Sequence, residues 1–183
     1  MKATFPLAVV FACLCIPTLT VAQSSTTTKP RTKVIVPVKD AKGNDVGTVK
    51  LKDLGDQGVE VELKLKNLSP GEHALHFHQN AKCEAPDFKS AGPHFNPSGK
   101  HHGLENAEGP HEGDMQNITV KADGTCDTEF VNPRVRLADP AIKNSLYTNG
   151  GTAVVIHAKA DDMKSDPAGN AGDRIACGVI TAQ

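Results

Sequence analysis

The segment VEVELKLK at residues 59–66 alternates apolar and charged side chains over its full length. This period of two is that of a β-strand with one face buried and the other in water. No window carries a convincing helical stripe, and Gly, Pro and Asn separate the apolar runs. Further strands are expected at 33–38, 46–51, 73–78, 118–121, 128–131, 153–159 and 175–181. About eight short strands predict an all-β fold, an antiparallel sandwich or barrel.

The N-terminus has the pattern of a secretory leader. An apolar run from Phe5 to Leu19 follows one lysine and ends in Thr-Val-Ala. The run is shorter than the about 20 apolar residues that span a bilayer, and Pro17 interrupts it. Lipidation at Cys13 is a lower-ranked alternative to simple cleavage. The expected order along the chain is a signal peptide at 1–22, a polar, disordered linker at 23–32 and one folded domain at 33–183.

Charge and cysteine content narrow the function. The formal net charge of −1 argues against a surface that binds a polyanion, so we expect no nucleic-acid partner. No stretch after the leader is expected to cross a membrane. Three cysteines remain in the mature chain, Cys83, Cys126 and Cys177. The periplasm or the cell exterior would allow one pair to form, and spacing alone does not say which.

All eight histidines lie between His73 and His157, and seven of them lie at 73–111. Two long segments, 79–116 and 161–174, interrupt the strands and hold much of the Gly, Pro, His and Asp. Loops of this length in a compact domain are usually functional. The histidine cluster therefore points to a metal site in these loops.

His76 and His78 flank Phe77 on an expected strand, so both imidazoles project from one face. An isolated pair of this kind is more often an accidental polar face than a metal site. The following loop favours the metal site over the accidental polar face, because it supplies three imidazoles and one carboxylate, which are suitable donors for tetrahedral zinc. These loop candidates are His94, His102, His111 and Asp114. Metal binding would also order a loop that has few apolar side chains.

From about Lys33 to the C-terminus the chain resembles the copper,zinc superoxide dismutases. Five segments in the same order carry the resemblance: HALHFH at 73–78, AGPHFNPSGKHHG at 91–103, HEGD at 111–114, VVIHAKADD at 154–162 and GNAGDRIACGVI at 169–180. The resemblance implies an eight-stranded antiparallel Greek-key β-barrel, an immunoglobulin-like sandwich with two long functional loops. This fold agrees with the strand count above.

The resemblance also implies two metal cofactors, a copper that cycles between Cu²⁺ and Cu⁺ and a Zn²⁺. The implied copper ligands are His76, His78, His94 and His157, and the implied zinc ligands are His94, His102, His111 and Asp114. His94 would be the imidazolate shared by both ions. The family's spacing from the shared histidine favours His102 over the adjacent His101, and by the same resemblance His73 corresponds to a structural histidine near the copper strand.

Further roles follow from the same resemblance. Asp161 would be the carboxylate that hydrogen-bonds one ligand histidine of each metal. Arg174 would attract and orient the anionic substrate. Cys83 and Cys177 would form the disulfide, which leaves Cys126 free.

The implied activity is the conversion of superoxide to molecular oxygen and hydrogen peroxide by alternate reduction and oxidation of copper, with His94 and Arg174 as catalytic residues. The main alternative is a non-catalytic extracytoplasmic copper/zinc-binding protein on the same fold, which would not need Arg174. A copper chaperone would carry a C-x-C or C-x-x-C pair, and the mature chain has none. A homodimer is left open.

Overall fold

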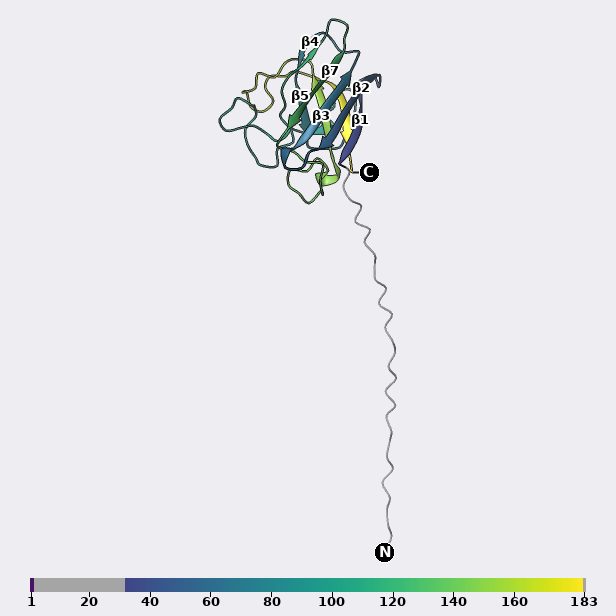
Figure 1. Ribbon diagram of the computed structural model, residues 1–183, viewed down its shortest axis with the longest axis vertical. Helices are drawn as coiled ribbons and strands as arrows, with labels where there is room; N and C mark the ends of the chain where they lie inside the picture. The colour runs from purple at the N-terminus through teal and green to yellow at the C-terminus, as the bar shows by residue number, and fades with distance from the viewer. Residues whose placement is uncertain (2–31, 183) are drawn as a thin grey trace.

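The structure is a computed structural model that describes Met1 and residues 32–182. The predicted signal peptide beyond Met1 and the linker up to residue 31 lie outside the described residues. Long loops connect the regular structure of the described chain, and that structure is almost entirely β-strand (Figure 1). Its strands are β1 (Lys33–Asp40), β2 (Asp45–Asp53), β3 (Val59–Leu65), β4 (Gly71–His73), β5 (Leu75–His78), β6 (Ile118–Val120), β7 (Cys126–Asn132), β8 (Thr152–His157) and β9 (Arg174–Ile180). Only short 3₁₀ turns, at Gly55–Gln57, Lys89–Ala91 and Thr148–Gly150, represent helix among these residues.

Seven strands form one antiparallel sheet in the order β5-β8-β9-β1-β2-β3-β7, and β4 pairs with β6 in a second sheet. The small sheet links the two edges of the large one, because β4 leads directly into β5 and β6 packs against β7. The large sheet is therefore curled into a half-barrel (Figure 1). This arrangement confirms the predicted all-β antiparallel fold.

The strand expected at 73–78 is divided at Ala74. There the chain changes partners, from β6 on one side to β8 on the other. Ala74 N–H donates to the Lys159 carbonyl, 2.8 Å, and the Ala74 carbonyl accepts from His157 N–H, 2.9 Å. Counting β4 and β5 as one run gives the eight runs that the sequence predicts.

The alternation in β3 works as expected, because Val59, Val61, Leu63 and Leu65 are buried in the main core and the charged residues between them face outward. β8 differs, since all of its residues are buried. Val154 and Ile156 face the main core, whereas Ala153 and Val155 pack under Phe88 and Ala91 of the long loop. The loop thus covers the outer face of β8, and a site between loop and sheet is shielded from water.

A disulfide joins Cys83 in this loop to Cys177 in β9, with the two Cα atoms 5.7 Å apart. The implied pairing is confirmed, and Cys126 is free and buried. The bond fixes the loop over the sheet. Among the described residues, none lies in a helix with the length and apolar character needed to span a bilayer.

Candidate metal centre

Strand geometry brings the first histidines together. β5 pairs with β8 so that His76 lies opposite Val155 and His78 opposite Ala153. Leu75 and Phe77 point into the core, which leaves the two imidazoles on the outer face, as the period of two requires. β8 ends at His157, where a register shift sets it opposite Arg174 of β9. The strands alone therefore assemble three histidines and one arginine.

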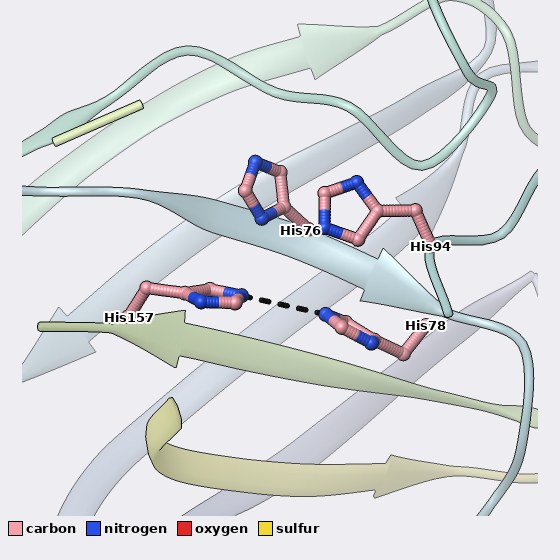
Figure 2. Close-up of side chains that lie close together, drawn as sticks. All are labelled: His76, His78, His94 and His157. Atoms are coloured by element: carbon pink, nitrogen blue, oxygen red, sulfur yellow. Dashed lines mark hydrogen bonds between the residues drawn. The ribbon is translucent and has the colours of Figure 1, made fainter. Parts of the chain in front are cut away.

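One nitrogen from each of four buried rings lies within 4.8 Å of the others, and the rings belong to His76, His78, His94 and His157. Figure 2 shows the four rings turned toward one another. His94 comes from the long loop, and the backbone bridge between His78 and His94 attaches that loop to the end of β5.

Three of these rings use their second nitrogen to bond a fixed acceptor. His78 Nδ1 donates to the Gly92 carbonyl at 2.8 Å, His157 Nδ1 to the Gly172 carbonyl at 3.3 Å, and His76 Nε2 to Asp161 Oδ2 at 2.7 Å. A ring that donates from one nitrogen is left with a lone pair on the other. These bonds select the tautomers that a metal needs.

The ring nitrogens that face the centre of the group have few protein partners for hydrogen bonds. His76 Nδ1 and His94 Nε2 are buried and make no hydrogen bond within the described part of the chain. The Nε2 atoms of His78 and His157 lie 3.4 Å apart. Buried polar atoms without partners cost free energy, and a cation bound at their centre removes that cost. Four imidazoles suit copper.

A second group surrounds Asp114. Its Oδ1 lies 3.0 Å from His94 Nδ1, 3.0 Å from His102 Nδ1 and 3.3 Å from His111 Nδ1. Its Oδ2 is already fixed by the backbone N–H groups of Gly103 and His111, each at 2.9 Å. One carboxylate oxygen cannot satisfy three ring donors well, whereas a tetrahedral cation between the four atoms can. The donor set fits zinc.

Within this second group the mutually close ligand atoms come from His76, His94, His102 and Asp114. His76 thus stands where the resemblance implied His111. The His76 and His94 rings are tilted by 33° with their centroids 4.0 Å apart, while the His111 centroid lies 5.5 Å from that of His94. Proximity alone therefore favours His76 as the fourth member of this group.

Asp161 joins the two groups. Besides accepting from His76 Nε2, its carboxylate lies 3.0 Å from His102 Nε2 and accepts from Met163 N–H at 2.6 Å. Sequence reasoning missed Asn117, which holds the Asp161 backbone by donating to its carbonyl at 2.9 Å and accepting from its N–H at 2.8 Å. It also missed Gly169, where a Cβ would lie 1.8 Å from Asp161 Oδ1.

The two groups differ in charge. Burial lowers the pKa of His76 to about 3 and that of His157 to about 4, and it holds the pKa of His78 well below its usual value. Burial alone would also lower the pKa of His102, but its bonds with Asp114 and Asp161 outweigh burial and raise it to about 9. The first group therefore offers neutral nitrogens at neutral pH, whereas in the second His102 is charged and lies between the carboxylates of Asp114 and Asp161.

Arg174 lies beside the first group. Its Nη1 donates to the Phe88 carbonyl and its Nη2 to the Gly92 carbonyl, each at 2.8 Å. The Gly92 carbonyl also accepts from His78, so the guanidinium and this imidazole share an anchor. No ion pair involves Arg174 among residues 32–182.

Two histidines stay outside both groups. The exposed His101 ring approaches Glu108 and Asp166, in agreement with the preference for His102. His73 bonds the carbonyls of His157 and Ser69 with its two nitrogens, at 2.7 and 2.8 Å, in agreement with a structural role.

Comparison with known proteins agrees with this geometry. Residues 46–180 match the family described as copper/zinc superoxide dismutase (SODC). The chain is 51% identical over 144 residues to superoxide dismutase [Cu-Zn] 1 of Aquifex aeolicus, covering 78% of this chain and 84% of the relative. A SOD-like protein from Bacillus subtilis superposes with a TM-score of 0.76 at 36% identity, covering 79% of this chain and 96% of the other. The Cu/Zn superoxide dismutase from Brucella abortus gives 0.65 at 28% identity, covering 81% and 99%.

The family match includes every segment that contributes to the two groups. The all-imidazole group is accordingly the copper site, and the group that contains Asp114 is the zinc site. The fold carries both sets of metal ligands, and relatives share about half of their aligned residues with it. The chain therefore belongs to the copper/zinc superoxide dismutase family.

Proposed function

We propose that this protein is an exported enzyme that converts two superoxide anions and two protons to molecular oxygen and hydrogen peroxide. The observation that carries the proposal is the complete set of four inward-facing imidazole nitrogens with an arginine beside it. A protein that only stores metal has no need of the arginine. Export is supported by the Cys83–Cys177 disulfide and by the leader pattern at 1–22.

For copper, we assign one nitrogen on each of four rings, namely His76 Nδ1, His78 Nε2, His94 Nε2 and His157 Nε2. Hydrogen bonds occupy the opposite nitrogens of three of these rings, and the fourth ring belongs to His94. For zinc, we assign His94 Nδ1, His102 Nδ1, His111 Nδ1 and Asp114 Oδ1.

His111 is preferred over His76 as a zinc ligand despite the shorter ring separation of His76. His76 has one free nitrogen, since its Nε2 bonds Asp161, and one lone pair serves one metal. His111 Nδ1 is buried without a hydrogen bond inside residues 32–182 and lies 3.3 Å from Asp114 Oδ1. A zinc ion would satisfy that atom.

Bound copper supplies the one-electron couple, and bound zinc keeps a single oxidation state. His94 has ligand atoms in both groups, because its Nδ1 faces Asp114 and its buried Nε2 faces the copper side. Nε2 has no competing partner in the described residues, so when it is released from copper it would be the atom placed to take up a proton and to return it to the departing peroxide.

Arg174 orients the substrate. A guanidinium has five N–H donors, and two carbonyl bonds leave others for an anion. These bonds hold the positive charge next to His78 at fixed geometry, which favours the approach and binding of superoxide.

The test combines metal analysis with superoxide decay on the mature protein. We expect about one copper and one zinc per chain. His157→Ala should keep zinc and lose copper and activity, whereas the matched surface variant His101→Ala should keep both metals and full activity. A protein that takes up zinc but no copper, or binds both metals without catalysis, would instead be the non-catalytic binding protein.

A further inference from the structure

A short segment after β7 contacts the zinc loop. Asn132 ends β7, and Pro133 and Arg134 follow it. The buried Asn132 Nδ2 donates to the Glu112 carbonyl at 3.0 Å, and Arg134 Nη2 donates to the Asp114 carbonyl. Two side chains from one segment thus hold alternate carbonyls of the HEGD turn, a role that a neighbouring strand would fill in a sheet.

The segment is itself firmly held. Asn132 Oδ1 accepts from Arg134 N–H at 3.0 Å, and Asn144 Nδ2 donates to the Arg134 carbonyl at 2.9 Å. Asn132 lies opposite Val59 in the β3–β7 ladder, and its carbonyl passes so near Gly58 that a Cβ there would lie 2.2 Å away. Asn132 is therefore anchored to the sheet, and Arg134 to Asn132 and to the segment between β7 and β8.

Arg134 is placed at a cost. Its Nε is buried with no hydrogen-bond partner in the described chain, and no ion pair forms between its guanidinium and a described carboxylate. Glu112 and Asp114 are the acidic residues whose charges act on it. Even half-buried, a cation with incomplete pairing is unfavourable, so packing alone does not explain this residue.

The hydrogen bond from Arg134 helps to fix the position of Asp114. Its Oδ2 is fixed by the backbone N–H groups of Gly103 and His111, and its carbonyl by Arg134. Only Oδ1 remains available, and it faces the three zinc-side imidazoles. A residue held at three points presents this oxygen with little freedom.

We propose that Arg134, supported by Asn132, is a positioning residue of the zinc site, which sets the carboxylate of Asp114 and raises zinc affinity without touching the metal. The inference rests on the proposed zinc ligand set. Because His94 belongs to both sites, correct placement of zinc also fixes the copper-side orientation of that ring.

The experiment compares Arg134→Met with Arg136→Met in the mature protein. Arg136 is a matched control because it lies two residues further on and pairs with Asp53 and Asp56, away from the zinc turn. Zinc affinity is measured by competition with a chromophoric chelator, and site geometry by the visible absorption of Co²⁺ bound in place of zinc. Arg134→Met should weaken zinc by about 10–100-fold and alter the Co²⁺ spectrum, while Arg136→Met leaves both unchanged.

Wild-type zinc affinity and Co²⁺ absorption in Arg134→Met would overturn the proposal, as would an equal loss in Arg136→Met. If Arg134→Met does not fold, Arg134→Lys decides, since it keeps the charge and the aliphatic stem but lacks the planar guanidinium. It should lose zinc affinity by a smaller factor, and wild-type affinity in it would also overturn the proposal. A wild-type protein without tight zinc binding would instead contradict the proposed function.

Discussion

Zinc binding should release a proton from His102. This ring is fully buried between two carboxylates, with Nδ1 3.0 Å from Asp114 Oδ1 and Nε2 3.0 Å from Asp161 Oδ1. Burial opposes its charge, but the two bonds prevail and raise its pKa to about 9 in the metal-free protein. At neutral pH the ring is therefore an imidazolium, and Nδ1 cannot ligate zinc until it loses its proton.

The sign and size follow from this pKa. Below pH 9 zinc competes with a proton, so zinc affinity should fall about tenfold for each unit that the pH decreases. Between pH 9 and pH 7 the loss is about 100-fold, or about 2.7 kcal/mol. The copper-side rings behave differently, because His76 and His157, with pKa values of about 3 and about 4, are already neutral at pH 7.

Calorimetric titration of the metal-free protein with zinc at pH 7, in two buffers of different ionisation enthalpy, counts the protons released. We expect about one proton from His102. Asp161→Asn removes one of the two carboxylates that stabilise the imidazolium, so it should release fewer protons even though its zinc affinity also falls. A zinc affinity that does not change between pH 7 and pH 8.5, with no proton released, would refute the reasoning.

Three further outcomes are expected. Arg174→Glu should cut the second-order rate of superoxide decay severely and weaken or invert its ionic-strength dependence, and unchanged kinetics with both metals bound would show that steering comes from elsewhere. Reduction of Cys83–Cys177, which are 94 residues apart, should lower the free energy of unfolding by up to about 4 to 5 kcal/mol in denaturant titrations, while Cys126 stays unreactive toward thiol reagents in the folded protein. In the metal-free protein His76 has a pKa of about 3, so between about pH 6.5 and pH 3 the unfolded chain binds a proton that the folded chain does not. The free energy of unfolding, measured in urea titrations, should therefore fall with decreasing pH over this range, and His76 alone should contribute about 1.4 kcal/mol per pH unit to the fall. A free energy of unfolding that stays constant over this range would contradict this prediction.

The sequence predicts best where a local period determines the geometry. Alternation in 59–66 predicts β3 almost to the residue, and spacing of two predicts that His76 and His78 share a face. The division of the 73–78 run at Ala74 has no such signal, because it depends on which strands lie to either side. Periodicity reports burial, and it does not report a change of partner.

Residues that support the metal ligands are harder to predict. Asn117, Asn132 and Arg134 are single polar residues without a pattern, and each acts on a segment distant in sequence. An asparagine at the end of a strand usually marks a turn. The role of Asn132 as a donor to the zinc turn becomes visible only when the folded sheet brings the two segments together.

The difference between the two sites follows from where their ligands come from. Three copper ligands, His76, His78 and His157, project from strands that hydrogen bonding already holds in register, so burial can strip them of water and keep them neutral. The zinc ligands come mainly from a loop, where carboxylates and backbone donors must supply the order that a strand would give. A zinc site whose ligands come from a loop therefore needs charged groups and many hydrogen bonds to fix those ligands. Asp161 connects this site to the copper site, because it bonds both His102 and His76. Changes at His102, His111 or Asp114 should therefore affect copper through zinc and the shared His94, whereas changes in β5 or β8 should affect copper directly.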